Sequence, residues 1–162
     1  MNPGLRKFAL TAHITSSVGW LGAAVAFLAH AIAGLTSQDA HLVRAAYSAM
    51  ELTGWYVLIP LSLASLATGL IQSFGTKWGL IRHYWVLVKF SLTVFATIIL
   101  LTFMRGFGNL VIGAAEPTSS GGHGGGSPVV HAVLGTLVLI TAVLLSVYKP
   151  WGKTPFGRRE VA

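Results

Sequence analysis

The stretch Val129–Tyr148, VVHAVLGTLVLITAVLLSVY, contains no Asp, Glu, Lys or Arg. A helix of this length rises about 30 Å, which matches the hydrocarbon thickness of a bilayer. Three further stretches are comparably apolar, at residues 8–35, 52–74 and 84–104. Because lipid offers no partners to backbone polar groups, each stretch must form a helix. The sequence therefore predicts an all-α bundle of four transmembrane helices with up-down-up-down topology.

The composition supports a single membrane domain over residues 1–162. Hydrophobic residues make up 54% of the chain and charged residues only 9%, which leaves too little polar surface for a soluble domain. The longest stretch outside the predicted spans, residues 106–128, contains a Gly-rich run, and we expect a solvated outer loop there. An alternative hypothesis is that His123 in this loop reaches a metal or substrate. Ser127 and Pro128 suit the cap and first position of the fourth helix.

Basic residues predict the orientation of the chain. The side that both termini share carries eight of them: Arg6, Lys7, Lys77, Arg82, Lys149, Lys153, Arg158 and Arg159. The other side carries Arg44 and Arg105, together with Asp39, Glu51 and Glu116. Short basic loops stay cytoplasmic, so we expect both termini in the cytoplasm. The net charge of +7 is then an orientation signal, and nucleic acid is not expected as a partner.

Several kinds of chemistry are excluded by the sequence. The chain has no cysteine, which excludes disulfides, thiolate metal sites, iron-sulfur clusters and covalently attached c-type haem. No Asp lies in any predicted span to orient a histidine, and there is no G-x-S-x-G, H-E-x-x-H or phosphate-binding loop. The chain thus has no hydrolase signature. A redox protein that transfers electrons is compatible with its residues.

Four histidines form two pairs at matching depths. His13 and His30 share one heptad seam of the first span and lie about 25 Å apart. The other residues of this seam, which we expect to face the bundle, are Ser16, Trp20, Ala23 and Phe27. His83 opens the third span on the inner side, level with His13, and His131 opens the fourth span on the outer side, level with His30. Imidazole is costly in a membrane unless a cofactor, metal or proton path uses it. We therefore predict a b-type cytochrome that binds one or two haems b by bis-His ligation.

Basic residues near each pair suit the haem propionates. On the inner side these are Arg6, Lys7, Arg82 and Lys89, and on the outer side Arg44 and Arg105. Two alternatives stay open: Lys89 extends back to the headgroups, and His83 is only an interfacial anchor.

Two other functions fit the same residues. The first is a copper- or zinc-binding membrane protein whose outer site uses several residues with suitable ligand atoms. The residues toward the outer side that could contribute are His30, His41, His123, His131, Glu51, Met50 and Met104. The second is a structural subunit without catalysis. A redox partner or quinone is compatible with electron transfer, and small residues along the first span would permit a homodimer.

The second span has two further local signals. Ser37, Gln38 and Asp39 precede an amphipathic stretch, residues 41–51, so its helix is expected to begin outside the membrane. Pro60 removes a backbone donor inside the span and predicts a kink.

Two motifs carry a family resemblance. They are His13 followed by Gly19-Trp20-Leu21-Gly22, and the sequence from Gly75 to Lys89, GTKWGLIRHYWVLVK. The chain resembles uncharacterised bacterial four-helix integral membrane proteins, common in high-GC bacteria. It is loosely similar to the copper-resistance D type of membrane protein, which has more helices. The resemblance implies a bacterial cytoplasmic membrane and a connection to haem or copper.

Overall fold

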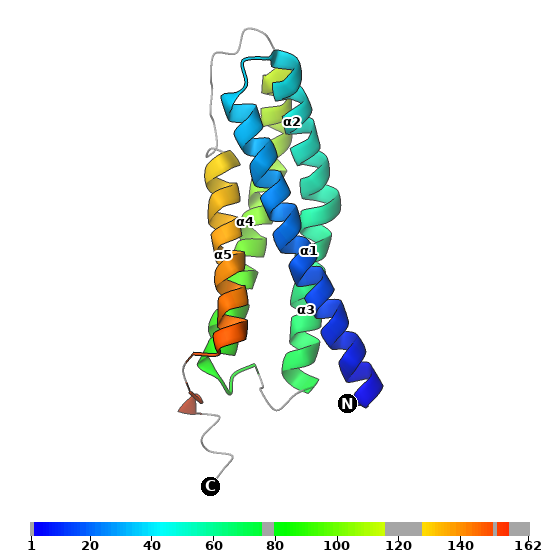
Figure 1. Ribbon diagram of the computed structural model, residues 1–162, viewed down its shortest axis with the longest axis vertical. Coiled ribbons are helices and arrows are strands. Elements are labelled where there is room, and N and C mark those ends of the chain that lie inside the picture. Colours follow the sequence, from blue (N-terminus) through cyan, green and yellow to red (C-terminus); the bar gives the residue numbers. More distant parts are fainter. Residues whose placement is uncertain (1, 76–79, 116–127, 151, 156–162) are drawn as a thin grey trace.

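The computed structural model describes residues 2–75, 80–115, 128–150 and 152–155. These residues form α1 (Pro3–Thr36), α2 (Ala40–Thr53), a π-helical turn η1 (Gly54–Leu58), α3 (Ile59–Gly75), α4 (Tyr84–Ala115) and α5 (Pro128–Tyr148). Since α2, η1 and α3 follow one another without a break, the described residues contain four helices long and apolar enough to cross a membrane. Figure 1 shows the resulting bundle. The predicted four-helix fold is confirmed.

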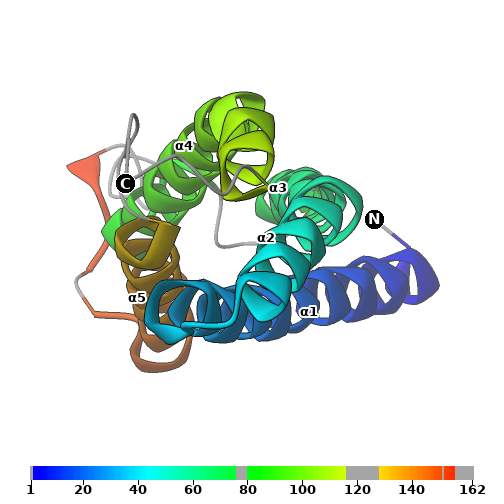
Figure 2. The same cartoon turned by 90° about the horizontal axis from the view of Figure 1, so that it is seen from above.

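The four long helices are arranged as a ring. α1 packs against the α2–α3 helix and against α5, and α4 packs against the same two neighbours. α1 and α4 therefore lie diagonally opposite each other, as Figure 2 shows from above. The start of α1 and the end of α5 lie at one end of the bundle, which we call the inner end; the α1–α2 connection lies at the opposite, outer end.

Helix ends follow from local capping residues. Asp39 accepts a hydrogen bond from the backbone N–H of His41 at 2.8 Å, and α2 starts directly after it, as the sequence predicts. α5 begins at Pro128, also as predicted, whereas Ser127 and His123 lie outside the described residues. α4 continues through residues 106–115, which corrects the prediction of a loop there. The apolar window marks only the part of a helix that lipid surrounds, and the helix itself extends further.

Pro60 is accommodated by a wide helical turn. Proline has no N–H to donate, and its ring clashes with the carbonyl four residues earlier. One residue before it, the N–H of Ile59 bonds to the carbonyl of Gly54, five residues back, which closes the π-helical turn η1. A π turn thus lies directly on the N-terminal side of Pro60, the residue at which the sequence predicts a kink.

The outer half of the bundle is tightly filled. Phe107, Met50 and Met104 are fully buried there. Three other rings surround Phe107, with centroid distances of 6.0 Å to Phe27, 6.2 Å to Tyr47 and 5.5 Å to Phe103. In contrast, many large apolar side chains on the outward faces of the helices are exposed, as contact with lipid requires.

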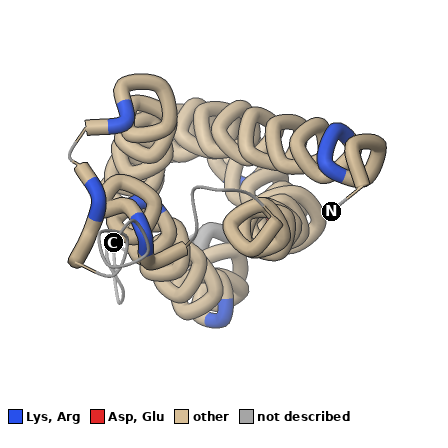
Figure 3. The backbone as a smooth tube through the Cα atoms, turned by 90° about the horizontal axis from the view of Figure 1, so that it is seen from below, with Lys and Arg blue, Asp and Glu red and all other residues tan. Residues whose placement is uncertain are grey.

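Basic residues lie around the inner end of the bundle. Figure 3 views this end from below, with blue Lys and Arg segments and no Asp or Glu in sight. The described basic residues near this end are Arg6, Lys7, Arg82, Lys149 and Lys153. Asp39 and Glu51 belong to α2, toward the outer end. This distribution agrees with a multi-pass membrane protein whose two ends differ in charge.

Candidate functional site

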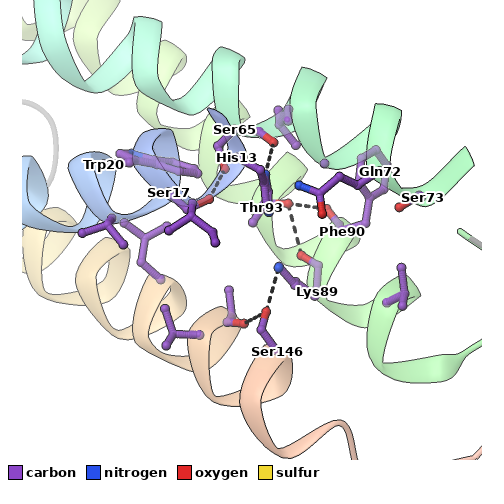
Figure 4. A pocket seen from close by; sticks show the side chains of 18 of the residues that line it. His13, Ser17, Trp20, Ser65, Gln72, Ser73, Lys89, Phe90, Thr93 and Ser146 are labelled. Atoms are coloured by element: carbon purple, nitrogen blue, oxygen red, sulfur yellow. Dashed lines mark hydrogen bonds between the residues drawn. The ribbon is translucent and has the colours of Figure 1, made fainter. Parts of the chain in front are cut away.

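A cavity of about 410 Å³ lies between α1, α3, α4 and α5 in the inner half of the bundle. Its walls combine aromatic rings with polar side chains, several of which Figure 4 shows pointing toward one another. The aromatic lining residues are Trp20, Trp85 and Phe90. The polar ones are His13, Ser17, Ser65, Gln72, Ser73, Lys89, Thr93, Ser146 and Lys149. This is a mainly apolar pocket that carries several polar groups, and two of the predicted site residues, His13 and Lys89, line it.

His13 is held by α3 through one edge of its ring. Its Nδ1 atom lies 3.1 Å from the carbonyl oxygen of Ser65 and 3.1 Å from Oγ1 of Thr68. A carbonyl oxygen can only accept, and the Thr68 hydroxyl donates to the carbonyl of Ala64 at 2.6 Å. Nδ1 must therefore carry the proton. In the neutral ring, Nε2 is then left with a free lone pair.

Gly69 allows the His13 ring to lie this close to α3. A Cβ atom added at Gly69 would lie 3.2 Å from Cε1 of His13, which is tighter than ordinary van der Waals contact. Both Nδ1 and Cε1 thus face α3, and the lone pair of Nε2, the ring atom on the other side of Cε1, points away from the partners of Nδ1. This orientation makes Nε2 available to a ligand in the cavity.

Lys89 extends from α4 across to α5. Its Nζ atom donates to Oγ of Ser146 at 2.7 Å, and the Ser146 hydroxyl donates to the carbonyl of Ala142 at 2.9 Å. Lys89 is half-buried and lines the cavity, so its ammonium group points into the bundle. The hydrogen bond to Ser146 thus supports the prediction that Lys89 is a residue of the site. It does not support the alternative in which the Lys89 side chain extends to the lipid headgroups.

The other inner residues lie at the edge of the site. His83 directly precedes α4, forms an isolated antiparallel bridge with Lys153, and has its ring centroid 6.5 Å from that of Trp85. The carbonyl of Arg82 accepts a hydrogen bond from the N–H of Thr154 at 2.9 Å. His83 is therefore one side chain away from the cavity, next to the described part of the C-terminal segment.

At the outer end, the two predicted ligands have different neighbours. His30 is half-buried, and its Nδ1 atom lies 2.7 Å from the carbonyl of Ala26 on the same helix, which again leaves Nε2 as the free nitrogen. His131 stacks on Phe103, with centroids 4.3 Å apart and the ring planes at 20°. Arg44 and Arg105 are exposed on α2 and α4.

The described residues contain no group of three or more His, Asp or Glu side chains that could hold a metal ion. His30, His131 and Glu51 therefore do not form such a site by themselves. His123, the other predicted ligand, lies outside the described residues.

Sequence reasoning missed the residues that position His13 and Lys89. Ser65, Thr68 and Gln72 recur at helical spacing along one face of the second span, and this polar stripe was a usable signal. Ser146 gave no such signal, because a single serine in an apolar helix is common.

The fold and the cavity define a helical, multi-pass membrane protein with a ligand-sized, mainly apolar pocket between its spans, into which several polar side chains point. No family model matches this chain, and no curated protein or solved structure matches it either.

Proposed function

We propose that this protein is a membrane b-type cytochrome, which binds haem b and transfers electrons, with His13 as an axial ligand of an inner haem. The observation that carries this proposal is the hydrogen bond from Nδ1 of His13 to the Ser65 carbonyl. Histidines that bind metals almost always donate their other ring N–H to a carbonyl or carboxylate, which fixes the tautomer and the orientation of the ring. His13 has this arrangement at the wall of a cavity.

The cavity residues fit such a group. Trp20, Trp85 and Phe90 provide aromatic walls, and Lys89 provides a cation for a propionate. When bound, haem b would supply one-electron chemistry, and its potential would depend on its axial ligands and burial. The chain's own residues would bind and orient it and keep water out.

We propose His83 as the second ligand of the inner haem, because it lies at the start of α4, next to the inner end of the cavity. Its ring lies beside Trp85, which lines the cavity, so the ring would have to turn past Trp85 to reach a haem there. An outer haem would use His30 and His131, with Arg44 and Arg105 near its propionates. The bond from Nδ1 of His30 to the Ala26 carbonyl supports His30 as a ligand. The tightly filled outer half gives this second haem less support than the inner cavity gives the first.

An optical spectrum and elemental analysis of purified protein, expressed with added haem, test this function. We expect iron and a Soret band, with His30→Ala losing only the outer centre. His41→Ala is the matched control, because His41 is exposed at the start of α2. A spectrum without a Soret band contradicts the proposal. Copper or zinc in its place would support the metal-binding alternative, and the absence of any metal would support a structural subunit.

We also propose that the protein lies in a bacterial inner membrane with both termini in the cytoplasm. The chain has no cysteine, so single cysteines can report the orientation without background. Gln38→Cys, in the outer α1–α2 connection, should react with a membrane-impermeant maleimide on intact spheroplasts. Gly152→Cys, an exposed position after α5, should react only after lysis. The opposite labelling pattern would reverse the proposed orientation.

A further inference from the structure

Lys89 is a cation whose described hydrogen-bond partner is neutral. Its ammonium group bonds to the Ser146 hydroxyl, and no Asp or Glu is among the described residues that line the cavity. The described acids, Asp39 and Glu51, belong to α2, toward the outer end. A charge within a membrane span is costly unless an opposite charge or several hydrogen bonds compensate it. Among the described lining residues, no negative charge therefore compensates Lys89.

The remaining donors of Lys89 are suited to a carboxylate. An ammonium group has three donors, and the bond to Ser146 uses one of them. The Ser146 hydroxyl gives its own proton to the Ala142 carbonyl, so toward Lys89 it can only accept. Ser146 thus fixes the position of the ammonium group without neutralising it. Hydrogen bonds between an ammonium group and a carboxylate are about twice as strong as those between neutral groups.

The rest of the cavity is suited to an apolar body. Trp20, Leu66, Phe90 and Val143 line it along with the polar groups. His13 lies on the α1–α3 side and Lys89 on the α4–α5 side, with α1 and α4 diagonally opposite. A ligand that reaches both would span the cavity, with its apolar part between the rings and its acidic end at α4 and α5.

We infer that Lys89 makes this cavity a binding site for an apolar ligand that carries a carboxylate, with the carboxylate on the Lys89 ammonium group. Where the ligand is haem, this inference rests on the proposed function. It deepens that function, because it assigns the propionate end of the inner haem to Lys89. The carboxylate of a membrane fatty acid has the same chemistry, so the test includes both sources.

The experiment compares each acid with its ester in the wild type and in Lys89→Met, which keeps an unbranched side chain but has no charge. Haem and haem dimethyl ester are titrated into the purified protein in nanodiscs, and binding is followed by absorbance and by quenching of tryptophan fluorescence. We expect the wild type to bind free-acid haem about ten-fold more tightly than the ester or better. Lys89→Met should lose that preference while it still binds the ester, which also shows that the variant is folded. Lys153→Met, at an exposed lysine of the same end, should keep the preference.

An undiminished preference for the acid in Lys89→Met would overturn the inference and leave the haem proposal intact. If neither haem compound binds the wild type, the proposed function fails. The same comparison with the fluorescent fatty acid cis-parinaric acid and its methyl ester then decides the inference alone. A preference for this acid that depends on Lys89 supports the inference with a lipid carboxylate as its source, and no such preference overturns it.

Discussion

His13→Ala is expected to remove the inner haem, so that the Soret and α bands of that centre disappear from a protein that keeps its helices. Alanine has no ligand atom, and the neighbouring Ser65 carbonyl and Thr68 hydroxyl cannot replace the lost Nε2 atom. The side chain is only half-buried and lies beside an existing cavity, so its removal should cost little packing. Absorbance spectra of reduced and oxidised protein, with circular dichroism for helix content, measure both effects.

A second variant tests the position of the ring rather than its presence. Gly69→Ala keeps His13, but the new Cβ atom would lie 3.2 Å from Cε1 and must push the ring away from α3. Disturbing an outer-shell partner of a metal ligand typically weakens binding by about ten- to a hundred-fold. We expect haem affinity to fall by about ten-fold, measured by titration. Gly22→Ala, where an added Cβ meets nothing within 4 Å, is the control. Unchanged affinity in both Gly69→Ala and His13→Ala would mean that His13 is no ligand.

The fold was predictable from the sequence because hydropathy alone decides it. Twenty or so apolar residues must form a helix in lipid, whatever their neighbours are. Helix ends were less predictable: α4 runs eleven residues past Met104, to Ala115, because hydropathy does not register a helix that continues beyond the apolar core. The capping residue Asp39 did identify the start of α2, since its signal is local.

The site was predictable only in part, because the strict heptad seam drifts from the buried face. Along α1 the buried residues are Ala9, Ser16, Trp20, Ala24, Phe27 and Ala31. The heptad seam predicted correctly that Ser16, Trp20 and Phe27 are buried. It also predicted that Ala23 and His30 are buried, whereas in the structure the next residues, Ala24 and Ala31, are buried instead. A straight helix has 3.6 residues per turn, so residues seven apart do not lie directly above one another. The seam therefore rotates around the helix by about 20° in each heptad. The heptad pattern therefore does not predict correctly which face of α1 is buried near His30.

Partners across the bundle depend on which helices touch, and the sequence does not contain that information directly. α1 contacts α3, so His13 finds Ser65 and Thr68 there, while His83 lies at the start of the diagonal helix α4. Lys89 finds Ser146 because α4 and α5 are neighbours. The residue types at the site were thus foreseeable, and the hydrogen bonds that orient them were not.

Gly54→Ala is expected to lower the free energy of unfolding by about 1–3 kcal/mol through overpacking against Met104. An added Cβ atom would overlap both Cε and Sδ of Met104, a side chain that is only 1% exposed and has little room to move. The greater helix propensity of alanine, worth about 1 kcal/mol, offsets only part of this cost. Thermal unfolding in detergent or nanodiscs measures the loss. Gly135→Ala on α5, which meets nothing within 4 Å, should be neutral or slightly stabilising.

A double-mutant cycle with Met104→Ala isolates the cause of this loss. Met104→Ala alone should destabilise the protein by about 2–5 kcal/mol, because it leaves a cavity in the filled outer half. In that background, Gly54→Ala no longer meets the Met104 side chain and gains the propensity of alanine. We therefore expect the effect of Gly54→Ala to change from destabilising to neutral or stabilising, with a coupling above about 1 kcal/mol. If the two losses simply add, the close approach of η1 to α4 at Gly54 is not what the substitution disturbs.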